Sequence, residues 1–470
     1  MQNKIGRIRN FFSNHSRTHL HKNQISATQF SMSSASDVCD VVMGFDFGTS
    51  STKVVLQTPY HNNQRAFAVD FDEAAHASNK YLLPSILWVS QDGTTSLKQL
   101  PGYRKYSRFK LDLIEGPDSK KYDESLVLAT AYLANAFRFA REWFLNSQKT
   151  LYSEYTLRWA VNVGLPSENY ANKLISESYQ RIASSAWRLS LHDSITLNDA
   201  KKVMDCKDKE EELDDRDGAD ITCIPEVAAE VVCYARSDMR REGLHVLVDV
   251  GAGTLDICSF ILHEKEGDDH YELLTASVDQ LGAMILHEAR INEIINNNLS
   301  PIFSNGYDWI NKIPDNVNEY VVTKDVSTID KLKNVDNKHL QQCCKVLKTM
   351  IVKLKTKRDP NSRVWKNMLP IFIAGGGSNM QHYKDLISTL NEWLKEFYIE
   401  CCGIENRSLQ HPQNLIADID AKEYHRLAVA VGLSFPDTDI GEVARPEDIP
   451  DVALKPDKDF TDKMITKNNL

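Results

Sequence analysis

Residues 41–57, VVMGFDFGTSSTKVVLQ, place one carboxylate, that of Asp46, at the end of an apolar run. Gly48 and four hydroxyl residues follow, and a second apolar run then begins. The β-branched residues in both runs predict two strands joined by a turn of glycine, serine and threonine. The sequence therefore predicts an acid at a strand end, beside a turn that is rich in small hydrogen-bond donors.

A second stretch repeats this pattern. Residues 244–263, LHVLVDVGAGTLDICSFILH, again run from an apolar strand through an acid, Asp249, and a glycine turn into another apolar strand. Two copies of an unusual hairpin in one chain indicate two similar lobes that face each other. A third glycine-rich turn lies in residues 370–387, PIFIAGGGSNMQHYKDLI, where we expect a strand before the turn and a helix after it.

Strand and helix patterns alternate along the chain, and this alternation predicts an α/β architecture. Residues 81–90 predict one strand and residues 156–166 another. Residues 123–146 predict a long helix that begins with an acidic N-cap. Residues 167–187 predict a second long helix, whose apolar positions include Leu174.

The composition excludes several classes of protein. The chain of 470 residues is long enough for two domains or one large two-lobed unit. Its net charge of −10 disfavours a general nucleic-acid binder, whose surface is usually basic. No apolar run reaches the roughly 18 residues of a membrane span. The nine cysteines show neither a disulfide framework nor a zinc-binding spacing, so we expect buried thiols in a cytoplasmic protein.

The two ends and one internal segment differ from the rest. The first 36 residues hold five Lys or Arg, three His and no acid, so we expect a disordered basic arm, with a transit segment as the alternative. The charge run at 207–220 predicts a solvated loop. The polar tail after Pro446 is expected outside the core. The expected boundaries are 1–37 for the arm, 38–243 for lobe I, 244–440 for lobe II and 441–470 for the tail.

The turns suit a phosphate chain, because glycine lets successive backbone N–H groups converge on an anion. The hydroxyls of residues such as Thr49 and Thr254 add further donors. Asp46 and Asp249 would repel phosphate oxygens if they touched them directly. A hydrated Mg²⁺ removes this conflict, because carboxylates can hold its water molecules instead. No P-loop motif offers another explanation.

The three glycine-rich turns resemble motifs of a known family. DFGTSSTK, DVGAGTLD and AGGGS resemble the first phosphate, second phosphate and adenosine motifs of the actin, sugar kinase and heat-shock chaperone ATPase superfamily. The resemblance covers about residues 41–435 and implies two ribonuclease-H-like lobes around a nucleotide cleft. The chain is most similar to the ATPase domain of seventy-kilodalton (DnaK-type) heat-shock proteins. RWAVNVGLPSENY, IPEVAAEVVCYA, DQLGAMIL and LAVAVGLSF resemble segments of that domain.

The resemblance implies roles for individual residues. Asp46 and Asp249 would hold the hydrated Mg²⁺, Glu226 would help to orient the attacking water, and Asp256 would be a further active-site acid. Lys110 would contact the γ-phosphate, with an exposed surface lysine as the alternative. The residues implied to surround ATP or ADP are Gly48, Thr49, Ser50, Ser51, Gly251, Ala252, Gly253, Thr254, Gly375, Gly376, Gly377 and Ser378. The base that faces adenine is expected among Lys353, Lys355, Lys357 and Arg358.

The chain also departs from the chaperones. Fewer than 40 residues follow the last motif, so we expect no peptide-binding domain. Ala252 stands where chaperones usually carry glycine, and Arg426 stands where they carry an acid. The expected function is an Mg²⁺-dependent, slow ATPase that changes conformation with its nucleotide and signals to a protein partner or client. The alternatives are a small-molecule kinase, a filament-forming actin-like protein and a nucleotide-binding pseudo-enzyme. The sequence identifies neither the partner nor the oligomeric state.

Overall fold

The computed structural model describes residues 37–61, 64–75, 79–205, 218–299, 302–303, 313–321, 326–397 and 401–452. The expectations for the basic arm, for most of the charge run and for the end of the tail lie outside these residues. The described residues form an α/β protein with two large mixed sheets and one small sheet.

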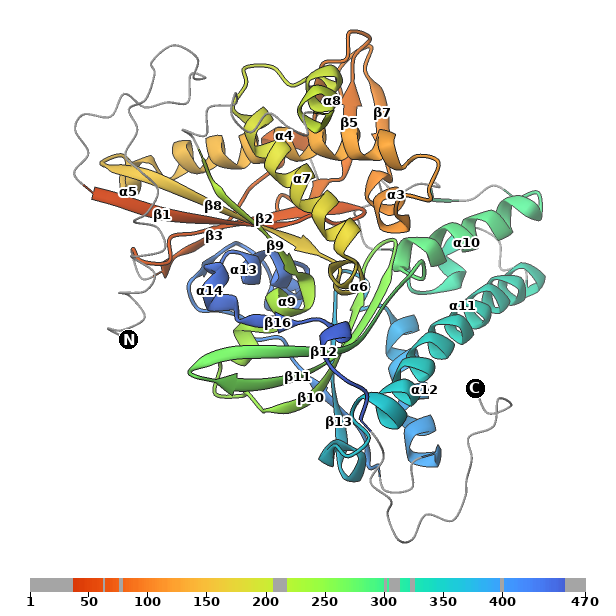
Figure 1. Ribbon diagram of the computed structural model, residues 1–470. Coiled ribbons are helices and arrows are strands. Elements are labelled where there is room, and N and C mark those ends of the chain that lie inside the picture. The colour runs from red at the N-terminus through yellow and green to blue at the C-terminus, as the bar shows by residue number, and fades with distance from the viewer. Residues whose placement is uncertain are drawn as a thin grey trace.

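The first large sheet has the strand order β15–β3–β2–β1–β8–β9, with β4 paired to β2. Strand β2 is antiparallel to β1 and β3, whereas β8 and β9 continue the sheet in parallel. Helices α4 (Tyr122–Ser147) and α7 (Lys173–Ser190) pack with it in one apolar core, above the sheet in Figure 1. The strands are β1 (Asp37–Asp46), β2 (Ser51–Gln57), β3 (Ala66–Ala68), β4 (Leu83–Pro84), β8 (Tyr155–Leu165), β9 (Asp220–Pro225) and β15 (Leu415–Ile416).

The second large sheet has the order β14–β13–β10–β11–β12–β16. Strand β11 is antiparallel to β10 and β12, and β13 and β14 extend the sheet in parallel. Helices α10 (Ala283–Asn296), α11 (Val326–Lys353) and α12 (Gln381–Phe397) cover it. The strands are β10 (Gly243–Val250), β11 (Leu255–Lys265), β12 (Asp268–Asp279), β13 (Met368–Ala374), β14 (Gly403–Arg407) and β16 (Glu442–Ala444).

The two sheets share one topology. The order β3–β2–β1–β8–β9 in the first sheet corresponds to β12–β11–β10–β13–β14 in the second, with the same parallel and antiparallel pairs. The repeated hairpin motif is therefore the first hairpin of each sheet. This confirms the expected fold class, an α/β protein with two ribonuclease-H-like units. The proposed lobe boundaries stay a prediction, and β15 from the second half of the chain pairs with β3 of the first sheet.

Two helices lie between the sheets, α9 (Glu226–Ala235) and α13 (Ala428–Leu433) (Figure 1). Helix α13 packs on β1, β2 and β8, and α9 shares an apolar cluster with β10, β11 and β13. The two helices cross so closely that a Cβ on Gly432 would lie 1.7 Å from the carbonyl oxygen of Ala229. Only glycine permits this crossing, so the segments IPEVAAEVVCYA and LAVAVGLSF are in direct contact.

The structure corrects three local expectations. Residues 81–90 form two short strands, β4 and β5 (Ile86–Val89), because β4 pairs with β2 whereas β5 pairs with the other two strands of the small sheet. Residues 167–187 form α6 (Ser167–Ala171) and α7, which are separated by Asn172; its side chain caps α7, and Leu174 is 67% exposed. Helix α4 has Lys121, not an acid, at its N-cap.

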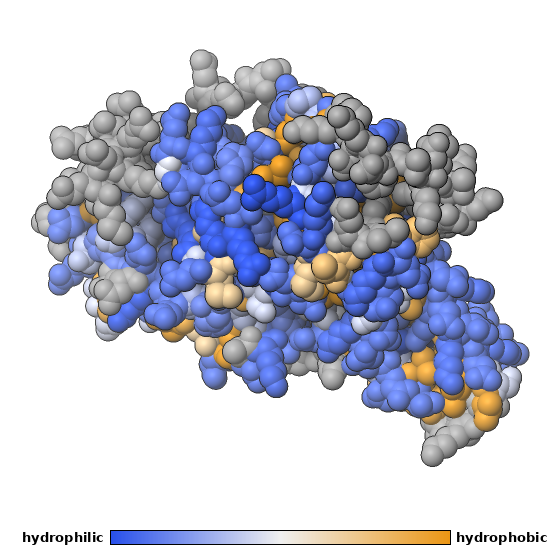
Figure 2. Space-filling model, turned by 90° about the horizontal axis from the view of Figure 1, so that it is seen from below, coloured by the Kyte–Doolittle hydropathy of each residue, from blue (hydrophilic) through white to orange (hydrophobic). Residues whose placement is uncertain are grey.

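The remaining elements are short, and strands β5, β6 and β7 form the small sheet. The described cysteines are free thiols. None of the described helices is long and apolar enough to cross a membrane, and the face in Figure 2 is largely hydrophilic, with small separate apolar areas. The short elements not yet given are α2 (Asp72–Ala75), β6 (Thr95–Ser96), β7 (Arg104–Ser107), α3 (Phe109–Glu115), α5 (Lys149–Tyr152), α8 (Leu197–Asp205), η3 (Val317–Tyr320), the π-helix η4 (Leu354–Arg358), η5 (Arg363–Lys366), η6 (Ala421–Arg426), α14 (Asp437–Ile440) and η7 (Pro446–Asp448).

Candidate functional site

A cleft with a volume of about 620 Å³ lies where the first hairpins of the two sheets meet. This volume falls within the range of roughly 300–1,000 Å³ that is typical of small-molecule sites. The cleft brings together fifteen of the residues expected from the sequence. They are Asp46, Gly48, Thr49, Ser50, Ser51, Lys110, Glu226, Asp249, Gly251, Ala252, Thr254, Asp256, Gly375, Gly376 and Gly377.

The first turn joins β1 to β2. Asp46 ends β1, and its partner across the hairpin is Lys53. The Lys53 ammonium lies 3.0 Å from the Asp46 carboxylate, and both residues line the cleft. The Ser85 hydroxyl donates to Gly48 O at 2.6 Å, which fixes the turn against β4 and β5. The first turn therefore presents a fixed acid and a fixed cation together.

The second turn, residues 251–254, joins β10 to β11 and is held by α10. The backbone N–H of Ala283 donates to Gly251 O at 3.0 Å, and that of Met284 donates to Ala252 O at 2.8 Å. The N–H and C=O groups of one trans peptide point in opposite directions. Because the carbonyls face α10, the amides that follow them in the turn point away from α10. This arrangement suits an anion.

The first and second turns touch each other. A Cβ on Gly253 would lie 2.9 Å from Cγ2 of Thr49 and 2.8 Å from Cδ2 of Leu111. Glycine is therefore required for the close approach of the two hairpins. Gly253 fills this contact and is not one of the residues that line the cleft.

The third turn follows β13. Gly375 has φ of +79°, and a Cβ there would lie 1.9 Å from Oδ1 of Asp249 and 2.5 Å from Val250 O. The N–H of Gly377 donates to Val250 O at 2.9 Å, so this turn is bonded to the end of β10. Ser378 is half-buried, does not line the cleft, and donates its N–H to Gly375 O. The expected strand, turn and helix are all present, as β13, the turn and α12.

Three acids converge beside these turns. One carboxylate oxygen from each of Glu226, Asp249 and Asp256 lies within 4.8 Å of the other two. The Oδ1 atoms of Asp249 and Asp256 are buried without a hydrogen-bond partner among the described residues. Burial and the charges of Glu226 and Asp46 raise the pKa of Asp249 to about 7. Burial and the charges of Asp249 and Glu226 hold the pKa of Asp256 well above its usual value. A divalent cation would relieve this repulsion, so these residues fit Mg²⁺.

Lys110 and Glu226 form a buried ion pair. The Lys110 ammonium lies 3.2 Å from Oε1 of Glu226, and the two residues are 6% and 8% exposed. Burial alone would lower the pKa of Lys110, but the neighbouring Glu226, Tyr179 and Asp46 raise it above its usual value. Burial raises the pKa of Glu226, against the effect of Lys110. The alternative of an exposed surface lysine at position 110 is therefore wrong.

The structure adds residues that the sequence analysis did not select. Lys53 occupies the position in the first hairpin that Asp256 occupies in the second, since Asp46 pairs with Lys53 and Asp249 pairs with Asp256. Glu230 lies one helical turn after Glu226, and both of its carboxylate oxygens are buried without a partner among the described residues. Hairpin register and helical spacing are visible in the sequence and could have identified both.

The bases that line the cleft also include residues that were not expected. Lys384, Lys422 and Arg426 line it, and none of the four candidates at 353–358 does so. Arg358 is directed elsewhere, because its guanidinium donates to the carbonyl oxygens of Pro446 and Ile449. The position of an adenine-facing base stays a prediction, and the four candidates do not line this cleft.

No family model matches the chain, and no curated protein sequence matches it. Solved structures do match, among them a crystal structure of MreB 5 of Spiroplasma citri bound to AMPPNP. The two chains are 11% identical, and the TM-score is 0.43. The alignment covers 84% of this chain and 94% of that chain. A likeness at this level says nothing about the ligand of this chain.

Proposed function

We propose that the chain binds ATP and ADP with Mg²⁺ in the cleft between its two large sheets and hydrolyses ATP slowly. The observation that carries this proposal is the contact between the two hairpin turns. Each turn follows a strand that carries an acid, and both acids line one cleft of suitable volume. The resemblance of the turns to the phosphate motifs of the actin-like ATPase superfamily supports the same proposal.

The phosphate chain would lie between the first and second turns. The backbone amides of the second turn point away from α10, and Thr49 and Thr254 add hydroxyl donors at the cleft. The ammonium group of Lys53 would neutralise phosphate charge from the first turn. Such charge-assisted hydrogen bonds are stronger than those between neutral groups.

Asp46 and Asp249 would hold the hydrated Mg²⁺, with Asp256 close by. When bound, the ion neutralises charge on the phosphate oxygens. The unpartnered oxygens of Asp249 and Asp256 are the atoms that the chain itself offers for this purpose. The third turn would lie against the adenosine, where Gly376 is exposed at the cleft.

Glu226 would orient the attacking water molecule and accept a hydrogen bond from it. Lys110 holds the Glu226 carboxylate in place and keeps positive charge near the terminal phosphate. Glu226 is the first residue of α9, and α9 crosses α13 between the sheets. A change at the terminal phosphate would therefore be transmitted to the helix pair that joins the two sheets. This movement would signal to a protein partner, as the similarity to the DnaK-type domain implies.

Calorimetry with ATP and ADP, in the presence and absence of Mg²⁺, tests the binding step. The wild type should bind both nucleotides, and Asp249→Asn should lose the Mg²⁺-dependent part of the affinity. Glu264→Gln is a matched control, because Glu264 lies exposed at the far end of the strand that carries Asp256. A wild type that binds neither nucleotide would refute the proposal, as would an Asp249→Asn variant with unchanged affinity.

Steady-state release of phosphate tests the hydrolysis step. Glu226→Gln should keep nucleotide binding and lower turnover about 100-fold, the lower end of a general-base effect. Release without any added acceptor would support water as the acceptor. Formation of ADP that requires an added sugar or polyol and releases no free phosphate would contradict hydrolysis and favour a kinase.

A further inference from the structure

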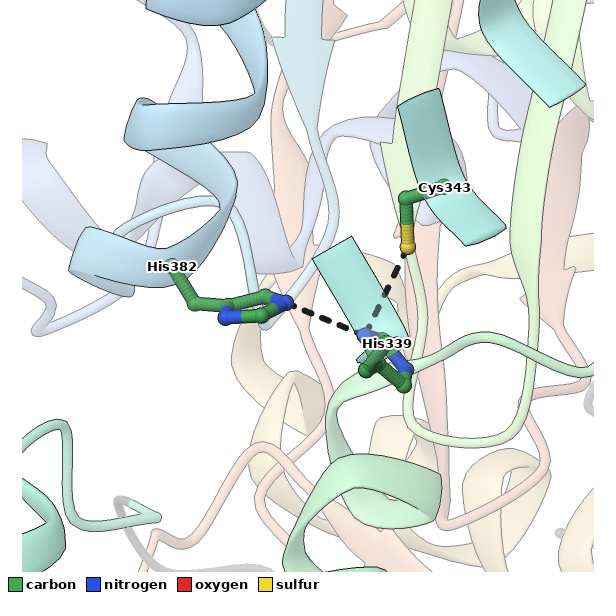
Figure 3. Close-up of side chains that lie close together, drawn as sticks. All are labelled: His339, Cys343 and His382. Carbon is green, nitrogen blue, oxygen red and sulfur yellow. Dashed lines mark hydrogen bonds between the residues drawn. The ribbon is translucent and has the colours of Figure 1, made fainter. Parts of the chain in front are cut away.

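A second cluster of potential ligands lies away from the cleft, between α11 and α12. His339 and Cys343 are one helical turn apart on α11, and His382 comes from the first turn of α12 (Figure 3). All three side chains are buried, at 5%, 0% and 9% exposure. One ligand atom from each lies within 4.8 Å of the other two.

The separations between these atoms match a tetrahedral metal site. Zn–N bonds of about 2.05 Å and a Zn–S bond of about 2.3 Å, at tetrahedral angles, place two nitrogens about 3.4 Å apart and a nitrogen and sulfur about 3.6 Å apart. Nδ1 of His339 lies 3.0 Å from Nε2 of His382, and Sγ of Cys343 lies 3.5 Å from the same Nδ1. These two separations are therefore close to those of a tetrahedral site, and the third, between His382 and Cys343, lies within 4.8 Å.

Hydrogen bonding alone does not satisfy this cluster. Nδ1 of His339 has either one lone pair or one proton, yet both His382 and Cys343 approach it. In either tautomer of His339, Nδ1 can therefore form a full hydrogen bond with only one of these two groups. A cation would accept the lone pairs of both imidazoles and of the thiolate at the same time.

We propose that His339, Cys343 and His382 bind a zinc-type divalent transition-metal ion through Nδ1, Sγ and Nε2. Binding would release the thiol proton of Cys343 to solvent. A water molecule would complete a tetrahedral coordination shell. None of the three ligands lines the proposed nucleotide cleft.

The chemistry of the ligands selects the class of ion. Sulfur and imidazole suit Zn²⁺ and Co²⁺, whereas Mg²⁺ and Ca²⁺ require oxygen ligands. The imidazoles are uncharged at neutral pH, because burial lowers the pKa of His339 and that of His382 to about 4. Arg290 is the positive charge nearby, and the Asp336 carboxylate offsets it with contacts of 2.7 and 2.8 Å.

The position of the site predicts what the ion does. His382 lies four residues after the third turn, and Tyr383 donates its hydroxyl to Leu281 O at 2.8 Å, beside the start of α10. An ion that joins α11 to α12 would fix the first turn of α12. The metal should therefore act mainly as a structural link, and its removal should lower the thermal stability of the chain.

The full chain, stripped with a chelator and dialysed, can be titrated with Zn²⁺ and with Co²⁺. The wild type should bind about one ion per chain, and the Co²⁺ form should show thiolate-to-metal charge-transfer absorption. Cys343→Ser should lose this absorption and weaken affinity by more than the roughly 10- to 100-fold that a lost outer-shell partner costs. Excess Mg²⁺ should not displace the ion.

Cys344→Ser is the matched control, because Cys344 is the next residue on α11 and is not one of the clustered ligands. It should bind Zn²⁺ as the wild type does. If Cys343→Ser does not fold, as judged by circular dichroism, His382→Gln replaces it, since His382 lies in the first turn of its helix. The proposal is overturned if the wild type binds neither ion, or if the folded ligand variant binds Zn²⁺ with wild-type affinity.

Discussion

Replacing Gly375 with alanine should destabilise the folded chain, because the new Cβ would clash with identified atoms of β10. The left-handed φ of +79° costs about 1–2 kcal/mol for a residue with a Cβ. The new Cβ would lie 1.9 Å from Oδ1 of Asp249, which can rotate, and 2.5 Å from Val250 O, which is backbone. Overpacking of this kind costs about 1–3 kcal/mol. We expect Gly375→Ala to lower the free energy of unfolding by about 2–5 kcal/mol.

Gly376→Ala is the matched control at the next position. Its nearest neighbour would be Nε of Arg426, 3.7 Å from the new Cβ, which is an ordinary contact. Its free energy of unfolding should therefore stay within about 0.5 kcal/mol of the wild type. The methyl group would nevertheless enter the cleft, so affinity for ATP should fall although stability does not.

Urea unfolding followed by tryptophan fluorescence measures the stability of both variants, and calorimetry measures their ATP affinity. A Gly375→Ala variant as stable as the wild type would refute the close packing of the third turn on β10. A Gly376→Ala variant with unchanged ATP affinity would refute the placement of the nucleotide against this turn.

Three further predictions concern charged or titratable groups. Lys110→Met should lower the free energy of unfolding by about 3–5 kcal/mol, because it leaves the buried Glu226 carboxylate without its partner; a change below about 1 kcal/mol in urea unfolding would contradict the buried pair. Lys53→Met should weaken ATP binding about 10- to 100-fold in calorimetry, because one charge-assisted hydrogen bond is worth about 1.5–3 kcal/mol, while Lys53→Arg should retain most of the affinity. Burial lowers the pKa of His245 to about 4 in the folded chain, below about 6.5 in the unfolded chain. The unfolded state therefore gains a proton at this group first as the pH falls, and His245 alone should lower the stability by about 2 kcal/mol between pH 7 and pH 5. A His245→Gln variant should lose this part of the pH dependence; an equal drop in the variant would assign the effect to other groups.

The features that depend on neighbours in the chain could be predicted from the sequence. The β-branched runs and their turns defined both hairpins, and the repeated acid and glycine pattern identified two equivalent units. These features follow from backbone preferences and from the period-two alternation of strands, which act over a few residues. The pairing of Asp46 with Lys53 belongs to the same class, because hairpin register follows from the turn.

The helix expected over residues 167–187 was wrong because local interactions compete with the hydrophobic periodicity. At Asn172 a periodic apolar pattern continued, but the Asn side chain caps a new helix. The exposed Leu174 shows that an apolar residue at helical spacing need not face the core. In both cases a side-chain hydrogen bond or the local direction of the chain outweighed periodicity.

The contacts between residues far apart in the chain could not be predicted from local patterns. The contact of Gly253 with Thr49, the ion pair of Lys110 with Glu226, and the approach of His382 to α11 join segments that no local pattern links. These contacts depend on how the two sheets and their helices pack, because packing over long sequence separations sets distances that turn and helix propensities leave open. For the same reason the sequence identified Lys110 and four acids of the cleft, but not Glu230 or the further bases, which include Lys384, Lys422 and Arg426.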